Sequence, residues 1–394
     1  MKRSVLAVTG SRAEYGLMRP VFRSIIEHPL LNLEMVVTGM HLLPEFGASL
    51  AEIRNDHFCR LHEVHMAPAE DSGLAMAQAL GRALVGLPPV LAKIQPDVLL
   101  LQGDRGEMLA AALAAAHMNV PIVHMSGGDF SGTIDDSMRN AISKFAHLHL
   151  TTCADSSARL LAMGEKRDRI IEVGEPGLDV IREMSAIDPK LLAAELGIDI
   201  DRPIVLATQH PVTTEADRAG WQMQQTLEAL SEAGLQTVFT YPNIDAGGRE
   251  MTRVLESYGG QAFLRIVPHL GSEKFLSLMR IASVMVGNSS SGILEAASFK
   301  LPVVNIGTRQ HGRLRAINVI DVGYAKQEIL QGVQRALNDQ QFRASLNKCK
   351  NPYGDGHTGP RTADILARMR ISPALVAKWL DSDGGFLPEG AYGV

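Results

Sequence analysis

"PDVLLLQGDRGEMLAAALAAAH", residues 96–117, joins an apolar run without alternation to a stretch rich in alanine and leucine. An apolar run of this length is typical of a parallel strand that is covered on both faces. Alanine and leucine favour helix, so the composition predicts a helix over 105–117. The turn "GD" lies between the two. The stretch therefore predicts a strand–turn–helix unit of an α/β fold.

The same pattern recurs along the chain. Further strands are predicted at 5–10, 33–39, 121–127, 148–153 and 169–174, and then at 204–211, 236–242, 263–268, 284–290, 303–307 and 319–323. Residues 184–203 interrupt the rhythm with two prolines and a polar insert. We therefore predict two Rossmann-like, doubly wound domains that face a central cleft, over 1–185 and 186–372. The last helices could cross back to the first domain, and 373–394 is predicted to be a tail.

Composition limits the possible functions. The 394 residues, 46% hydrophobic and 21% charged, suit two globular cores. A formal net charge of −5 argues against nucleic acid or an anionic membrane as the main partner. Three cysteines without CxxC spacing fit a reducing cytoplasm. No segment has 18 uninterrupted apolar residues, and the N-terminus does not read as a signal peptide, so we expect no membrane span.

Ligands of open α/β sheets bind at the carboxyl ends of the strands, which makes the residues after each strand the candidates. "TGSRAEYG" (9–16) places Arg12 where a helix begins, a position that suits a phosphate, although a bare turn explains it equally well. In "GDRGE" (103–107), Asp104 is either a helix cap or a base beside the anion-binding Arg105.

"PIVHMSGGDFSGTIDDS", residues 121–137, gathers His124, Asp129, Asp135 and Asp136 at a predicted strand end. A helix cap accounts for Asp135 but not for Asp129 or His124. Several carboxylates near one histidine shift each other's pKa, as proton transfer requires. The stretch therefore indicates acid–base chemistry.

The second half carries a candidate nucleotide site. His210 follows a predicted strand, where it is either structural or catalytic. In "GNSSSGILEAASFKLPVVNIGTRQHGR" (287–313), serines and helix amides can hold phosphate, Glu295 can accept two ribose hydroxyls, and Arg309 can face the phosphates. No histidine or carboxylate group has metal-binding spacing.

Together, "VTGSRAEYG", "QGDRGE", "HMSGGDFSGTIDD", "QHPVTT", "GNSSSGILEAASF", "PVVNIGTRQHGR" and "NPYGDG" resemble, in order, the hydrolysing UDP-N-acetylglucosamine 2-epimerases of sialic and legionaminic acid biosynthesis. The resemblance implies the two-domain GT-B fold and a homodimer, and a reaction without metal or nicotinamide. It implies anti elimination of UDP to a glycal, followed by rehydration to a free N-acetylmannosamine-type sugar.

The resemblance also assigns roles to individual residues. Asp104 matches an acid/base residue, Asp135 matches an acidic residue of the catalytic loop, and His210 matches a histidine near the departing phosphate. Many relatives carry glutamate where this chain has Ser126, so Asp129 or Asp135 is predicted to supply that carboxylate. The ligand-binding matches are Arg12, His41, Arg105, Gly174, Ser289, Ser290, Glu295 and Arg309.

Three other functions fit parts of the same pattern. A non-hydrolysing 2-epimerase would return the epimerised nucleotide sugar, but it usually carries "TGTRPE" and "HxEAGLR". A GT-B glycosyltransferase would need an acceptor sugar. A nucleotide-sugar sensor would not need Asp104 and His210. The sugar substituent at C4 and the choice of UDP or GDP stay open.

Overall fold

The computed structural model describes residues 2–43, 49–66, 72–131, 135–243 and 245–378. The chain forms two compact units: unit 1 comprises Met1–Val180 and Tyr353–Val394, and unit 2 comprises Ile181–Pro352. Residues 353–372, which the sequence analysis included in the second domain with the option of crossing back, belong to unit 1. Each unit is an α/β domain, as predicted, and each is described separately below.

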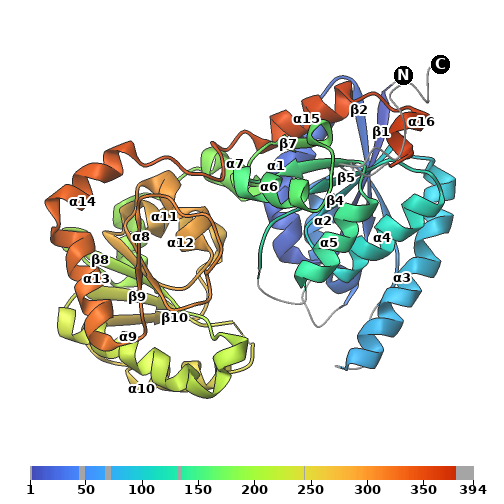
Figure 1. Ribbon diagram of the computed structural model, residues 1–394. Helices are drawn as coiled ribbons and strands as arrows, with labels where there is room; N and C mark the ends of the chain where they lie inside the picture. The colour runs from blue at the N-terminus through green and yellow to red at the C-terminus, as the bar shows by residue number, and fades with distance from the viewer. Residues whose placement is uncertain (1, 44–48, 67–71, 132–134, 244, 379–394) are drawn as a thin grey trace. The chain divides into compact units, whose positions relative to one another are not determined.

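Unit 1 contains a seven-stranded parallel sheet in the order β3-β2-β1-β4-β5-β6-β7 (Figure 1). Six of these strands were predicted. The edge strand β3 was not, because "RLHE" contains a single apolar residue and lies at the exposed side of the sheet. The strands are β1 (Arg3–Thr9), β2 (Leu31–Val37), β3 (Arg60–Glu63), β4 (Val98–Gln102), β5 (Ile122–Met125), β6 (Leu148–Thr151) and β7 (Ile170–Glu172).

Helices cover both faces of this sheet. Along β1, Val5 and Ala7 belong to one core, whereas Leu6 and Val8 belong to the core on the opposite face. This double burial explains why the strands have no polar alternation. The helices are α1 (Arg12–Glu27), η1 (Gly39–Leu42), α2 (Ser49–Asn55), α3 (Gly73–Ile94), α4 (Gly106–His117), α5 (Asp135–Phe145), α6 (Ala154–Ala162), η3 (Arg167–Arg169) and α7 (Pro176–Glu183), of which the last runs into unit 2.

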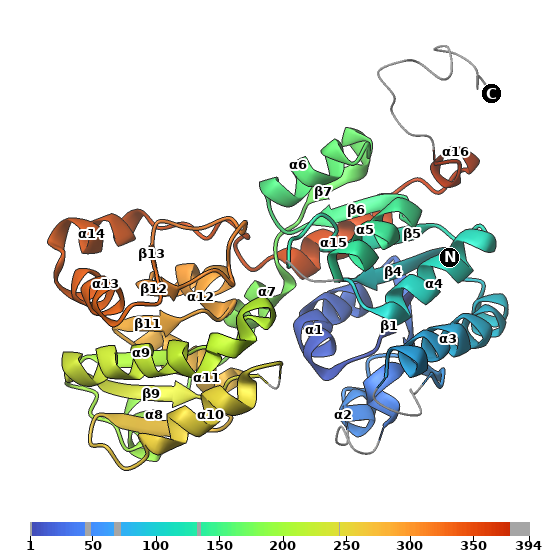
Figure 2. The ribbon, with the colours of Figure 1, turned by 60° about the horizontal axis from the view of Figure 1, so that its bottom comes forward.

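α3 is the one helix among the described residues that is long and apolar enough, by length and composition, to cross a membrane. One of its faces, which includes Ala79, Ala83 and Leu87, is buried, and the helix packs beside α4 (Figure 2). Leu74, Met76, Leu84 and Val85 are exposed on this helix, the last with 77% of its surface accessible. The helix therefore belongs to the covering layer of the sheet and also carries several exposed apolar side chains.

The C-terminal segment returns to unit 1 through α15 (Thr358–Arg368) and α16 (Pro373–Val376). α15 packs along α1 (Figure 1). Arg3 donates a hydrogen bond to the carbonyl of Leu366. Within the predicted tail from residue 373, α16 and Lys378 make specific contacts with unit 1. The remaining tail residues lie outside the described part of the chain.

Unit 2 contains a six-stranded parallel sheet in the order β10-β9-β8-β11-β12-β13, and all six strands were predicted. The strands are β8 (Ile204–Thr208), β9 (Gln236–Thr240), β10 (Leu264–Val267), β11 (Val284–Gly287), β12 (Val303–Ile306) and β13 (Val319–Val322). The helices are α8 (Pro189–Leu196), η4 (Thr213–Arg218), α9 (Ala219–Ala233), α10 (Gly248–Ser257), α11 (Gly271–Ile281), α12 (Ser291–Leu294), η5 (Ala296–Phe299), α13 (Lys326–Asn338), α14 (Gln340–Ser345) and η6 (Leu346–Lys348). α9 packs against α10 and α13 over a core that includes Val205, Met223 and Ile329.

Candidate active site

Asp104 lies in the turn after β4, beside the buried guanidinium of Arg139 from α5. The two form an ion pair. Arg139 Nη1 also donates to Asp136 Oδ1 at 2.6 Å and to the carbonyl of Asp129 at 2.8 Å. Burial raises the pKa of Asp104, Arg139 opposes this effect, and Asp135 and Asp136 raise the pKa further. The guanidinium of Arg139 therefore binds three segments at once: the turn after β4, the loop after β5 and the first turn of α5.

Asp129 directs its carboxylate toward the residues after β6. Its Oδ1 accepts hydrogen bonds from Thr152 Oγ1 and Ser156 Oγ, both at 2.6 Å. Since its carbonyl also accepts from Arg139, Asp129 connects α6, α5 and its own loop. These contacts give Asp129 an anchoring role in the loop.

His124 is a structural residue of the same region. It is fully buried, and burial lowers its pKa to about 3, so the ring is neutral. Its Nε2 lies 2.7 Å from the carbonyl oxygen of Gly103, which can only accept, so Nε2 carries the proton. Its Nδ1 therefore accepts from Ser143 Oγ, 3.0 Å away. His124 connects α5 to the backbone that carries Asp104.

Ser126, where many relatives carry glutamate, occupies a buried position with φ +60°. Its hydroxyl and the side-chain amide of Gln102 form hydrogen bonds at 2.9 and 3.3 Å. The pair of Ser126 and Gln102 carries no charge. An acid for this part of the site has to come from another position in the chain.

A second group of buried polar side chains lies at the carboxyl end of β1. Glu14 Oε2 accepts from Thr9 Oγ1 at 2.7 Å and from the Gly10 amide at 3.2 Å, while its Oε1 is buried without a hydrogen-bond partner among the described residues. Thr9 Oγ1 also lies 3.0 Å from Nε2 of the buried His41. Burial raises the pKa of Glu14 to about 8. Burial lowers the pKa of His41 to about 4, and the positive charge of Arg105 contributes to this lowering.

Arg105 links this group to α4. Its Nε donates to Glu107 Oε1 at 2.7 Å, and Glu107 is 3% exposed. A side chain at Gly10 would meet Glu107, because a Cβ there would lie 1.9 Å from Glu107 Oε1. Glu14 and Glu107 thus approach the same glycine from two sides. Like charge from Glu107 adds to the raised pKa of Glu14.

Arg12 and Gly174 lie apart from these contacts. The Arg12 side chain at the start of α1 is 75% exposed, with Nε 3.4 Å from Glu52 Oε2, so its guanidinium is available to an anion. Gly174 has φ +100°, and a Cβ there would lie 3.1 Å from the carbonyl oxygen of Tyr353. The glycine lets the chain after β7 approach the returning C-terminal segment, where the Glu175 amide donates to the Tyr353 carbonyl at 2.7 Å.

In unit 2, His210 and Asn288 follow the neighbouring strands β8 and β11. The His210 amide donates to Asn288 Oδ1 at 2.7 Å, and Asn288 Nδ2 donates to the His210 carbonyl at 2.9 Å. The amide of Asn243 donates to His210 Nδ1 at 3.0 Å. Burial lowers the pKa of His210 to about 4, and the positive charge of Arg309 contributes to this lowering. The ring is therefore neutral, with its proton on Nε2, which makes Nε2 a hydrogen-bond donor.

Two of the predicted nucleotide-binding residues, Ser289 and Arg309, lie next to Asn288. Ser289 Oγ accepts from the Ser291 amide at 3.3 Å where α12 begins, and Ser290 lies between them. Arg309 Nη1 donates to the Asn288 carbonyl at 3.1 Å, and burial lowers its pKa, with Arg313 adding to the effect. Burial raises the pKa of Glu295 at the end of α12. The site therefore contains a desolvated cation beside serine hydroxyls, which suits a phosphate.

Comparison with known proteins identifies the family. The sequence pattern described as UDP-N-acetylglucosamine 2-epimerase matches residues 23–367. The chain belongs to this family.

The chain is 42% identical, over 96% of its length and 99% of the relative, to UDP-N,N'-diacetylbacillosamine 2-epimerase (hydrolyzing) of Legionella pneumophila. It is 35% identical to GDP/UDP-N,N'-diacetylbacillosamine 2-epimerase (hydrolyzing) of Campylobacter jejuni, over 81% of this chain and 84% of the relative. Among solved structures, UDP-GlcNAc 2-epimerase from Neisseria meningitidis bound to UDP-GlcNAc matches with a TM-score of 0.72 and 20% identity, over 93% of this chain and 99% of the other. The predicted resemblance and the GT-B fold class are confirmed.

Sequence reasoning missed three charged residues of this epimerase. Glu14 and Glu107 lie inside the quoted motifs "TGSRAEYG" and "GDRGE", so their presence within these motifs was the available signal. Arg139 had no comparable signal, because its role depends on the packing of α5 against a turn 35 residues away.

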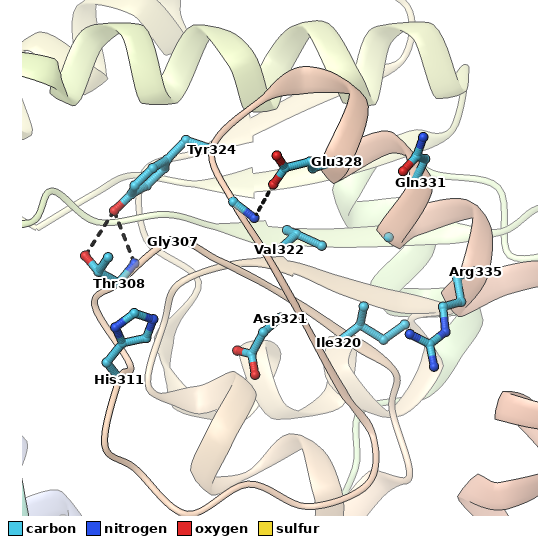
Figure 3. Close-up of a pocket in the computed structure, with 12 residues that line it drawn as sticks. Gly307, Thr308, His311, Ile320, Asp321, Val322, Tyr324, Glu328, Gln331 and Arg335 are labelled. Carbon is cyan, nitrogen blue, oxygen red and sulfur yellow. Dashed lines mark hydrogen bonds between the residues drawn. The ribbon is translucent and has the colours of Figure 1, made fainter.

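Two further features were compared with the site. A hollow of about 640 Å³ in unit 2 lies beside β13 and is lined by Thr308, Tyr324, Glu328 and others, but by none of the predicted site residues (Figure 3). Its polar groups bond within the chain, with the Thr308 amide 3.2 Å from Tyr324 OH and the Gly323 amide 2.7 Å from Glu328 Oε2. Among the described residues, no group of three histidine, cysteine or acidic side chains could hold a metal ion.

Proposed function

We propose that this protein is a hydrolysing 2-epimerase that converts a UDP-linked 2,4-diacetamido sugar to the free 2-epimer and UDP. The observation that carries the proposal is the similarity to the Legionella pneumophila relative, which extends over 96% of this chain at 42% identity. UDP-N-acetylglucosamine is the alternative substrate. The product is a mannosamine-type sugar, of the kind that sialic and legionaminic acid biosynthesis consumes.

In the first step a carboxylate removes the proton from C2. The electron pair of the C2–H bond forms the C1–C2 double bond, while the C1–O bond breaks and UDP leaves with its electron pair. In the second step water adds its oxygen to C1, and C2 receives a proton on the opposite face. The net reaction consumes one water and needs no redox change.

Asp104 and Asp135 are the proposed acid/base pair. Asp104 pairs with Arg139, and the charge of Asp135 helps to raise the pKa of Asp104. The raised pKa brings Asp104 closer to the operating range of a proton-transfer group. Asp129 is proposed to hold the loop in place through Thr152 and Ser156 rather than to transfer a proton. This assignment selects Asp135 from the two residues that the sequence left open.

His210 is proposed to assist the departure of UDP as a hydrogen-bond donor. Its Nδ1 is occupied by the Asn243 amide, so Nε2–H is the group available to a phosphate oxygen. Arg309 and Arg12 are proposed to stabilise the negative charge on the diphosphate, Ser289 and Ser290 to bind phosphate oxygens, and Glu295 to bind the ribose. His41, Arg105 and Gly174 complete the proposed ligand-binding set. In this proposal unit 2 binds the nucleotide and unit 1 supplies the acids.

We also propose a homodimer in the cytoplasm. The exposed apolar side chains of α3, Leu74, Met76 and Val85, support an interface on this helix. The three cysteines are free, as a reducing compartment favours.

A proton NMR time course in D₂O tests the activity, with the UDP-linked 2,4-diacetamido sugar and UDP-N-acetylglucosamine in parallel tubes and the GDP-linked sugar in a third. We expect a free 2-epimer that is deuterated at C2, together with UDP, and fastest turnover of the UDP-linked diacetamido sugar. An epimer still linked to UDP would instead indicate the non-hydrolysing reaction. Tight binding without any product would indicate a sensor.

A further inference from the structure

Lys378, beyond α16, is largely buried against the carboxyl end of α5. Its Nζ donates to the carbonyl oxygens of Ser143 and Ala146 at 2.7 and 2.6 Å, and it forms an ion pair with Glu165 Oε2 at 2.7 Å. An ammonium group has three N–H donors, so these three acceptors satisfy it completely. A cation at this end of a helix also interacts favourably with the helix dipole.

The surroundings hold Lys378 in place. Glu165 is 4% exposed, and its carboxylate also pairs with His149 Nε2 at 3.1 Å and with Lys144 Nζ at 3.0 Å. Burial alone would raise the pKa of Glu165, but the hydrogen bonds from His149 and Lys378 lower it to about 2. A second contact holds the C-terminal segment in place: Arg169 Nη1 donates a hydrogen bond to the carbonyl of Leu375 at 3.4 Å.

α5 in turn positions Asp104 through two sets of contacts. Arg139, in the middle of the helix, pairs with the Asp104 carboxylate. Ser143, whose carbonyl accepts from Lys378, donates through its hydroxyl to His124, which donates to the carbonyl of Gly103, the residue before Asp104. A continuous series of hydrogen bonds therefore runs from Lys378 to the turn that carries Asp104.

We infer that Lys378 is a positioning residue for the reaction: by fastening the C-terminal segment to the end of α5, it fixes the register of that helix and thereby the placement of Asp104 and Asp135. The inference rests on the proposed function, since it concerns the acids of that reaction. Lys378 touches no reacting atom and acts only through α5.

The test compares the full-length wild type with Lys378→Met, which keeps the side-chain length but removes the charge and donors, and with the conservative Lys378→Arg. Lys274→Met is the matched control, because Lys274 forms an exposed ion pair with Glu195 in unit 2. We expect Lys378→Met to lower kcat about tenfold while KM and the affinity for UDP change less than twofold. We expect Lys378→Arg to recover most of the rate and Lys274→Met to match the wild type.

Amide hydrogen exchange of residues 135–146 provides a readout that does not depend on turnover. We expect faster exchange there in Lys378→Met and unchanged exchange in β8 and β11 of unit 2. A folded Lys378→Met protein with wild-type kcat and wild-type exchange in α5 would overturn the inference. A lower melting temperature with unchanged kcat at low temperature would also overturn it, since the role would then be structural only. If the wild type itself gives no product, the proposed function fails, and the exchange data alone decide whether Lys378 fixes α5. If Lys378→Met does not fold, the kcat and exchange of Lys378→Arg, measured against those of the wild type, decide in its place.

Discussion

Replacing Glu14 by glutamine is predicted to remove a large part of the pH dependence of stability. Burial raises the pKa of Glu14 from 4.5 to about 8. Between these values the folded protein holds a proton on Glu14 that the unfolded chain releases. Stability from this group is therefore complete below about pH 4.5 and is lost as the pH rises toward 8. Glutamine does not titrate, so Glu14→Gln removes this loss.

The size of the effect follows from the interval between the two pKa values. At about 1.4 kcal/mol per pH unit, the interval from 4.5 to about 8 corresponds to about 5 kcal/mol. Glu14 is only 9% exposed, so solvent screening reduces this figure little. Relative to the wild type, Glu14→Gln should gain stability steadily from pH 5 to pH 8.

Urea unfolding followed by far-ultraviolet circular dichroism, at half-unit steps from pH 5 to pH 8.5, measures this difference. Glu273→Gln, an exposed glutamate in unit 2, controls for loss of a carboxyl group. The expected result is that the wild-type and Glu14→Gln curves differ in slope, whereas Glu273→Gln runs parallel to the wild type. Parallel curves for all three proteins would refute the reasoning, because Glu14 would then be ionised in the folded state.

Three further predictions concern the proposed reaction and assembly. Asp104→Asn should lower kcat by about 10²- to 10⁴-fold, the usual contribution of a general acid or base, while the affinity for UDP measured by calorimetry stays unchanged. Asp129→Asn should keep kcat within a few fold of the wild-type value. A loss as large as that of Asp104→Asn would return Asp129 to the acid/base pair. Arg309→Met should weaken UDP binding by about tenfold or more, since a hydrogen bond to a charged group contributes about 1.5–3 kcal/mol, and an unchanged calorimetric Kd would exclude Arg309 from the nucleotide site. Val85→Glu should convert a dimer to a monomer, as measured by light scattering, because it places a charge among the exposed apolar side chains of α3. A dimer that persists would move the interface elsewhere.

The sheets were predictable because burial on both faces requires apolar residues throughout a strand, and such runs are visible in the sequence. β4 and β8 consist of fully buried residues, and both coincide with apolar runs. β3 left no such record, since its four residues are half-buried or exposed. Strand ends then gave the candidates Asp104 and His210 through topology alone, without knowledge of side-chain contacts.

The electrostatic environment was not predictable in the same way. "SRAEYG" shows a glutamate one turn into a helix, which normally faces solvent, yet Glu14 is buried because it accepts from Thr9 and the Gly10 amide. His124 looked like a partner for the acids of its loop, but its ring bonds to Gly103 and Ser143 instead. Such assignments depend on which groups meet in the folded chain, and periodicity contains no information on that.

The role of α5 shows how a site can depend on residues that no motif contains. Three separate segments meet on this helix: the β4 turn through Arg139, the β5 strand through Ser143, and the C-terminal segment through Lys378. A helix moves as a rigid unit, so a displacement at its carboxyl end reaches Arg139 with little loss. Substitutions that weaken the contacts of α5 should therefore lower kcat together, whereas substitutions of nucleotide-binding residues such as Arg309 should change the affinity for UDP. The double variant Lys378→Met/Arg139→Lys should accordingly lose less rate than the product of the two single losses, because both single variants disturb the placement of one group, Asp104.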